Sequence, residues 1–263
     1  MGPTRCARGR TGLGLCAIGV IVLAACNVIT PLDPSLGARF LTTDADDDQG
    51  VVVVGDGDDV TVTSPAANTG ANTRIVFWRL SDPAVTDAAT CMSWTVPSDQ
   101  TSHQPGVALR VRQGDEGRTA ITVTQNIYFG AYWGFNVHLW DDAATPTVVK
   151  IAGFDMSAAL LRDGVPGPTP WRLCARVVGD VVTFRVWAAD TAEPAWDDPV
   201  HTGSVVLPAG WVRPGRVGWY AGHVPTGSAL TLSDLAVTDL TVVPPVPEDP
   251  VPPRAPTAIA QAP

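Results

Sequence analysis

Hydrophobic and polar residues alternate with a period of two along most of the chain between residues 38 and 241. This period is typical of a β-strand with one buried face, because successive side chains of a strand point to opposite sides of its sheet. The alternation predicts strands over residues 73–80, 89–96, 107–113, 119–127, 134–140, 147–154, 171–178, 181–188, 200–207, 216–223 and 230–240.

Glycine, proline and aspartate separate these runs and predict the turns between them. The clearest turn is Gly179-Asp180, where two residues join two alternating runs as a tight hairpin. Residues 156–163 alone have a helical pattern. Many short strands with turns at this spacing predict an all-β fold, either a β-sandwich or a jelly roll.

The two ends of the chain differ from this region. Arg5, Arg8 and Arg10 precede an apolar stretch over residues 11–25, which is shorter than the roughly 18 residues of a membrane-spanning helix. This layout predicts an export signal over residues 1–25. Residues 26–37 are then a polar tether, residues 38–241 the β-sandwich domain, and residues 242–263 a proline-rich tail that is predicted to be disordered.

The end of the signal reads Leu23-Ala24-Ala25-Cys26, which resembles the lipobox of bacterial lipoproteins. The resemblance implies that the sulfur of Cys26 receives a diacylglyceryl group with acyl chains such as palmitate and that the signal is then cut just before Cys26. The protein is then anchored on the extracytoplasmic face of the cell membrane. Two acyl chains suffice for stable anchoring. Two alternatives remain open: ordinary cleavage near Ala24 and Ala25 that releases the protein, and an uncleaved anchor.

Cysteine use follows from this layout. Cys6 and Cys16 leave with the signal, and Cys26 takes the lipid, so Cys91 and Cys174 remain. An even pair in an exported domain predicts a disulfide, and alternation places both thiols on the polar side of their strands. Two buried free thiols are the alternative.

The charge of the chain excludes one class of function. The formal net charge is −9, and loss of the three arginines of the signal leaves 14 basic and 26 acidic residues, a net charge of about −12. Lys150 is the only lysine. A chain this acidic offers no basic patch for a phosphate backbone, so nucleic-acid binding is excluded.

Three stretches resemble the concanavalin A-like and laminin G-like jelly rolls. They read WRLCARVVGDVVTFRVWAADTAEPAW, GWVRPGRVGWYAGH and LTLSDLAV. Two further stretches are similar to the central strands of that domain, and they read ALRVRQ and TAITVTQNIYFGAYWGFNVHLW. The resemblance covers about residues 38–241 and implies an all-β fold, a two-sheet antiparallel β-sandwich of the concanavalin A-like jelly-roll kind. This architecture hosts lectins, glycosidases, lyases and adhesion modules, so it leaves the function open.

Alternation on three successive strands gathers polar and aromatic residues on one sheet face. Such a mixture suits sugars, because aromatic rings pack on pyranose C–H surfaces and polar groups bond to hydroxyls. Trp94, Trp171 and Trp219 are predicted to lie in the core instead. The predicted glycan-binding residues are Arg110, Asn126, Asn136, His138 and Trp140, with Tyr132 and Trp133 at the rim. The alternative is an ordinary solvent-facing sheet.

Metal-binding and catalytic motifs are scarce. Acidic stretches at residues 44–48, 56–59 and 141–142 are candidates for a loop-bound Ca²⁺, but solvated turns are the preferred interpretation and no cofactor is predicted. The three glutamates, Glu116, Glu193 and Glu248, lie too far apart for the Glu-x-Asp-x-x-Glu motif of glycosidases of this fold.

The sequence therefore predicts a lipid-anchored surface protein whose jelly roll binds cell-wall or external glycans without catalysis. Two alternatives stay open: a protein-adhesion or structural surface domain without a sugar site, and an atypical glycoside hydrolase or lyase that uses an aspartate pair. The sequence makes no prediction of oligomeric state.

Overall fold

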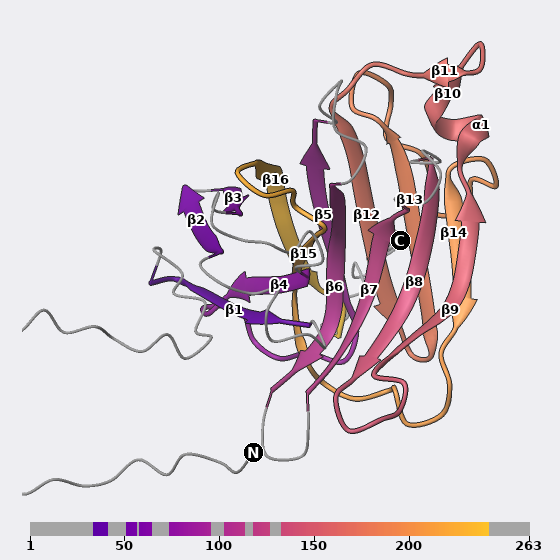
Figure 1. Ribbon diagram of the computed structural model, residues 1–263. Helices are drawn as coiled ribbons and strands as arrows, with labels where there is room; N and C mark the ends of the chain where they lie inside the picture. The colour runs from indigo at the N-terminus through magenta and orange to yellow at the C-terminus, as the bar shows by residue number, and fades with distance from the viewer. Residues whose placement is uncertain are drawn as a thin grey trace, which may run out of the picture.

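The computed structural model describes residues 34–41, 51–56, 58–64, 74–95, 103–113, 118–126 and 133–241. Two seven-stranded antiparallel sheets pack face to face, as Figure 1 shows. Sheet 1 has the strand order β1-β4-β15-β6-β7-β8-β9, and sheet 2 has the order β14-β13-β12-β5-β16-β3-β2. The predicted all-β sandwich is confirmed.

The strands of sheet 1 are β1 (Leu36–Phe40), β4 (Arg74–Arg79), β6 (Gln104–Arg112), β7 (Thr119–Gln125), β8 (Gly134–Asp141), β9 (Val148–Asp155) and β15 (Arg216–Gly222). The strands of sheet 2 are β2 (Val52–Asp56), β3 (Asp59–Thr63), β5 (Ala88–Trp94), β12 (Trp171–Val178), β13 (Val181–Ala188), β14 (Thr202–Val206) and β16 (Ala229–Asp239). A short helix, α1 (Ser157–Leu160), and the small hairpin β10 (Leu161–Arg162) and β11 (Val165–Pro166) follow β9.

All the strands predicted from alternation are present within a few residues of their expected bounds, and β12 and β13 form the predicted hairpin around Gly179. Gly179 has a φ of 56°, which a glycine adopts without steric cost. The helix is shorter than predicted. Strands β1, β2 and β3 were not predicted, and β1 begins at Leu36, within the stretch interpreted as a tether.

The hydrophobic core fills the space between the sheets. Trp94, Trp171 and Trp219 belong to it, as predicted, and each is at most 2% exposed. Trp94 and Trp171 lie opposite each other on β5 and β12, with ring centroids 6.1 Å apart in an edge-to-face arrangement. Such pairs add about 0.5–1.5 kcal/mol to the free energy of burial.

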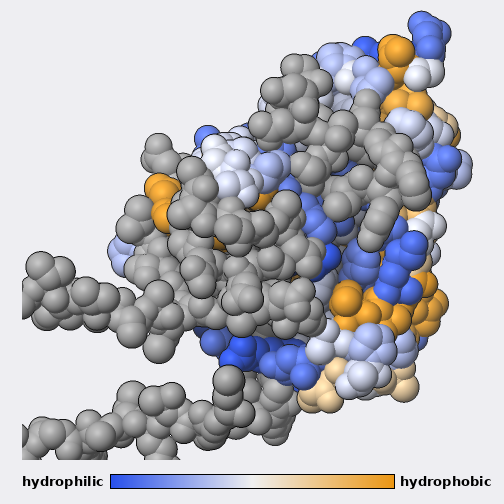
Figure 2. Space-filling model, in the orientation of Figure 1, coloured by the Kyte–Doolittle hydropathy of each residue, from blue (hydrophilic) through white to orange (hydrophobic). Residues whose placement is uncertain are grey.

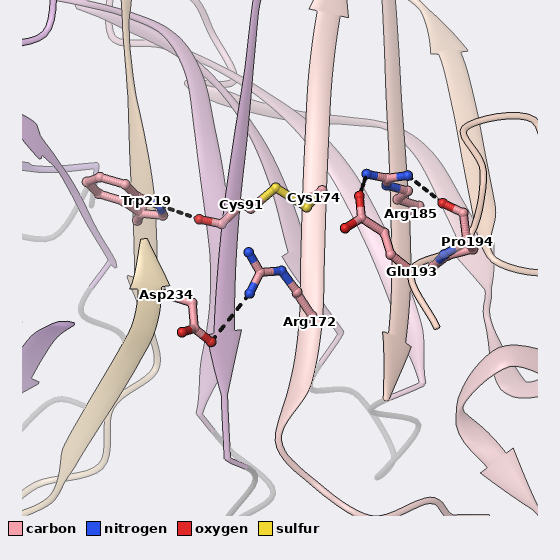
Figure 3. Close-up of a disulfide and its surroundings, with 8 residues drawn as sticks. All are labelled: Cys91, Arg172, Cys174, Arg185, Glu193, Pro194, Trp219 and Asp234. Atoms are coloured by element: carbon pink, nitrogen blue, oxygen red, sulfur yellow. Dashed lines mark hydrogen bonds and ion pairs between the residues drawn. A yellow bond between two sulfur atoms is a disulfide. The ribbon is translucent and has the colours of Figure 1, made fainter. Parts of the chain in front are cut away.

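Cys91 and Cys174 form the predicted disulfide between neighbouring strands β5 and β12, where they lie directly opposite each other (Figure 3). Their Cα atoms are 4.1 Å apart. Cys91 is half-buried but Cys174 is only 1% exposed, so the bridge is more covered than alternation predicts. The Trp219 indole of sheet 1 donates a hydrogen bond to the Cys91 carbonyl, 3.0 Å away, which ties the two sheets together beside the bridge.

The middle of sheet 1 is also buried on its outer face. A second hydrophobic cluster lies there, and every residue of β7 is buried. The alternative of an ordinary solvent-facing sheet therefore does not hold for the middle of this face. The cluster consists of Leu41, Val76, Trp78, Ala108, Val111, Ala120, Trp140 and Tyr220.

No helix in the described part of the chain has the length and apolar character needed to cross a membrane. The predicted signal with Cys26, most of the tether and the proline-rich tail lie outside the described residues.

Candidate functional site

A cleft of about 320 Å³ opens on the outer face of sheet 1, next to the second hydrophobic cluster. Five strands and the residue after β15 contribute to it. In Figure 2, hydrophilic and hydrophobic side chains adjoin each other over the part of the sheet formed by β8 and β9. The cleft is lined by Arg74, Gln104, Asn136, His138, Trp140, Val148, Lys150, Tyr220 and His223.

One wall of the cleft comes from alternate residues of β8 and their partners on β9. The register pairs Asn136 with Gly153, His138 with Lys150 and Trp140 with Val148. A Cβ atom added at Gly153 would lie 3.3 Å from Asn136 Oδ1 and 3.8 Å from Lys150 Nζ. The amide of Asn136 and the ammonium of Lys150 therefore lie on the same side of the sheet and close together.

Trp140 forms the floor of the cleft. Its indole is 5% exposed, and its Nε1 donates a hydrogen bond to Thr122 Oγ1 at 2.9 Å. The small residues Ala108 and Ala120 in the same cluster leave room for this large ring. A sugar cannot stack across the indole face in this arrangement, so the predicted stacking role of Trp140 is wrong. The residue supplies an apolar floor instead.

His138 carries little charge at neutral pH. Burial, together with the positive charges of Lys150 and Arg74, lowers the pKa of His138 to about 4. Its Nδ1 is buried without a hydrogen-bond partner among the described residues, so a proton there would bury an unsatisfied N–H group. The neutral imidazole thus lies in the cleft as a hydrogen-bonding group.

The opposite wall is built by Tyr220 and Gln104. The Tyr220 hydroxyl donates a hydrogen bond to Gln104 Oε1 at 2.7 Å, and burial raises the pKa of Tyr220 far above its usual range. A Cβ at Gly222 would meet the Tyr220 hydroxyl at 2.4 Å, so only glycine leaves room for the ring there. The guanidinium of Arg74 lies 5.9 Å from the centroid of the Trp140 ring and so connects this wall to the floor.

The structure brings together only part of the predicted site. Asn126 lies beside Asn136, whose Nδ2 donates a hydrogen bond to Asn126 Oδ1 at 3.3 Å. His138 and Trp140 share the cleft with Asn136. Trp133 packs against the core between the sheets rather than lining the cleft, and Tyr132 lies outside the described residues.

Arg110 is not part of the cleft, and its predicted outward orientation is wrong. The register of β6 against β7 shifts between Leu109 and Arg112, and Arg110 has a φ of 49°. This β-bulge interrupts the alternation, so Val111 joins the outer cluster. The Arg110 side chain is 1% exposed and lies at the end of the core.

The Arg110 guanidinium holds three chain segments together. It donates hydrogen bonds to the carbonyls of Thr86 (2.8 Å), Gly179 (2.7 Å) and Trp211 (2.8 Å), and it lies 3.4 Å from Asp87 Oδ1. Burial lowers the pKa of Arg110, and the carboxylate of Asp87 opposes that shift. Arg110 is therefore a structural cation.

Sequence reasoning missed Arg74, Gln104, Lys150, Tyr220 and His223. Of these residues, only Lys150 could have been identified from the sequence as a candidate, because it is the only lysine and lies within a predicted strand. The others come from strands far apart in sequence, and only the strand order of sheet 1 brings them to one face.

Of the acidic stretches, the structure describes the side chains of residues 58–59 and 141–142. No group of three or more metal-ligating side chains occurs among those residues. Asp58 pairs with Arg79 at 2.7 Å, Asp142 accepts a hydrogen bond from the Arg118 amide at 2.7 Å, and Asp141 accepts one from the Ala143 amide at 3.0 Å. These are the interactions of solvated turns. Residues 44–48 lie outside the described residues.

No protein-family model matches the sequence, and no curated protein sequence matches it significantly. Solved structures with a similar fold include a legume lectin-like domain from Entamoeba histolytica, with 9% identity and a TM-score of 0.48 over 81% of this chain and 95% of that one. The carbohydrate-binding module CBM66 from Bacillus subtilis has 8% identity and a TM-score of 0.46 over 80% of this chain and 100% of that one. The Ca²⁺/Man3GlcNAc-bound exoplasmic/lumenal domain of VIP36 has 12% identity and a TM-score of 0.46 over 83% and 90%. Likeness at this level does not extend to ligands.

Proposed function

We propose that the chain is a lipid-anchored extracytoplasmic protein whose jelly roll binds glycans in the cleft of sheet 1 without cleaving them. The observation that carries the proposal is the composition of the cleft. Directional polar groups from Asn136, His138 and Gln104 surround an apolar floor of Trp140 and Val148.

Sugars need this combination. Asn136 offers both an amide donor and a carbonyl acceptor, and His138 offers an imidazole, which together match the paired donor and acceptor character of neighbouring hydroxyls. The floor can contact only a small part of the C–H surface of a sugar, because Trp140 is almost fully buried, so the polar groups carry most of the recognition. The volume of about 320 Å³ lies within the range of small-ligand sites, about 300–1,000 Å³.

The lining residues also support binding rather than hydrolysis. Glycoside hydrolysis uses two carboxyl groups on either side of the scissile bond. The described residues that line the cleft include no aspartate or glutamate. None of the described lining residues therefore offers the carboxyl pair that such a reaction uses.

The test replaces His138 with alanine and measures binding to a panel of neutral and acidic glycans and to isolated cell walls. We use the full chain with Cys26→Ser, so that the protein is studied without lipid. His138→Ala is expected to weaken binding about tenfold, because losing a buried hydrogen bond costs about 1–3 kcal/mol. His201→Ala, at a histidine that pairs with Asp198 and does not line the cleft, is the matched control and is expected to bind normally.

Three results would contradict the proposal. The parent protein could bind no glycan at all, which would favour an adhesion or structural domain. The His138→Ala variant could fold and bind as well as the control. The bound polysaccharide could become shorter during incubation, which would contradict a non-catalytic role.

Anchoring has a separate test. Cys26→Ser in the otherwise unchanged chain is expected to abolish incorporation of labelled palmitate and to move the protein out of the membrane fraction. Cys16→Ser is the matched control and should change neither readout. Lipid labelling that persists in Cys26→Ser would exclude Cys26 as the attachment site.

A further inference from the structure

The cleft has a charge that contrasts with the rest of the molecule. The chain has a formal net charge of −9, yet the cleft contains the only lysine, Lys150, together with Arg74. None of the described lining residues is an aspartate or glutamate. Two fixed positive charges therefore face one small space in an acidic protein.

These two cations also differ from most other described cations in how they are used. Neither Lys150 nor Arg74 forms an ion pair with a carboxylate among the described residues. By contrast, six arginines are paired with carboxylates. The pairs are Arg79–Asp58, Arg110–Asp87, Arg118–Asp142, Arg162–Asp190, Arg172–Asp234 and Arg185–Glu193.

The two cations come from strands that are far apart in the sheet. β4 is the second strand of sheet 1 and β9 is the seventh, yet Arg74 and Lys150 line the same cleft. The Arg74 guanidinium reaches the Trp140 ring on β8, and the Lys150 ammonium lies near Asn136 on the same strand. A ligand on the Trp140 floor would have a positive charge on each side.

We infer that the cleft selects acidic saccharides, in which a carboxylate or sulfate group lies between Lys150 and Arg74. This inference rests on the proposed glycan site and specifies its ligand class. Asn136 and the neutral His138 then donate hydrogen bonds to the same anionic group or to a neighbouring hydroxyl. Charge-assisted hydrogen bonds are about twice as strong as neutral ones, so the anionic group supplies most of the selectivity.

Non-specific attraction does not account for such selectivity. The net charge of −9 gives the protein a net repulsion for a polyanion. At physiological salt this repulsion acts only within about 8–10 Å of the surface. An acidic polysaccharide that binds must therefore gain its affinity from local contacts. Because the net charge of the chain opposes the binding of a polyanion, tighter binding of an acidic polymer can be assigned to contacts in the cleft.

The test compares pairs of polymers with the same backbone. Polygalacturonate is compared with its fully methyl-esterified form, and dextran sulfate with dextran, using the full chain with Cys26→Ser. In at least one pair, we expect the affinity of the protein for the acidic polymer to be at least ten times its affinity for the neutral polymer. The two pairs distinguish a carboxylate from a sulfate as the recognised group.

Lys150→Gln is expected to reduce affinity for the acidic polymer about tenfold, and Lys150→Arg, which keeps the charge, to retain most of it. Lys150 is exposed, so neither variant should change the midpoint of unfolding. Arg172→Gln is the matched control, because it removes one positive charge from β12 in sheet 2. It should bind like the parent protein.

The outcomes separate the inference from the proposed function. Tighter binding of a neutral polymer that is lost in His138→Ala would overturn the inference and leave the proposed function standing. Equal losses in Lys150→Gln and Arg172→Gln would also overturn it, because the effect would then be one of net charge. Binding to none of the glycans would overturn both.

Discussion

The double variant Cys91→Ala/Cys174→Ala is expected to lose about 4–5 kcal/mol of unfolding free energy, if the bridge acts by restricting the unfolded chain. The disulfide joins residues 83 positions apart, so its removal frees a long loop in the unfolded state. A second contribution comes from the folded state, because Cys174 is 1% exposed and alanine leaves part of its volume empty. Guanidinium-chloride unfolding, followed by tryptophan fluorescence, measures the loss.

Chemical reduction provides the control for this prediction. The parent protein should lose a similar amount of stability when it is unfolded in the presence of a reductant, whereas the double variant should be insensitive to it. A loss below 1 kcal/mol in both experiments would mean that the unfolded chain keeps structure around β5 and β12. In that case the loop-length argument fails for this protein.

Much of the fold could be predicted from the sequence because apolar residues that face the core alternate with polar residues on the other side of the strand. This alternation of residue types holds even in β7 and β13, whose outer residues are also covered, and β12 and β13 are found at their predicted bounds. Strand β2 escaped prediction for a physical reason. Val53 is fully buried and Val54 is 40% exposed, yet both are valine, so the residue types conceal the alternation.

The candidate site was less predictable because alternation fails at a bulge and carries no information on strand order. The bulge at Arg110 moves one expected ligand-binding residue into the end of the core. The outer face of sheet 1 is itself largely buried, so Trp140 became a floor rather than a stacking platform. Arg74 and Tyr220 lie on β4 and β15, and only the three-dimensional topology places β15 between β4 and β6.

Arg110→Met is expected to destabilise the fold by about 3–5 kcal/mol, because breaking a buried charged network leaves its partners without compensation. Methionine fills much of the same space but offers no donors. The carbonyls of Thr86, Gly179 and Trp211 would then lose the hydrogen bonds that the guanidinium supplies. Chemical denaturation measures the loss.

Two further variants identify the cause. Arg162→Met removes an exposed partner of Asp190 and should cost less than about 1 kcal/mol, as is usual for surface ion pairs. Arg110→Lys keeps the charge but has fewer donors in a different geometry, so its stability should fall between those of the parent and Arg110→Met. A stability of Arg110→Met equal to that of the parent would show that the network contributes no net stability.

Substitution of Arg110 also tests whether its effect on stability is independent of glycan binding. Arg110 lies outside the cleft, so Arg110→Lys should keep the glycan affinity of the parent protein as long as it remains folded at the temperature of the assay. Binding is measured well below the unfolding midpoint for this reason. A folded Arg110→Lys protein with tenfold weaker affinity would mean that the segments held by this guanidinium position the cleft. The bulge of β6 would then belong to the binding machinery as well as to the fold.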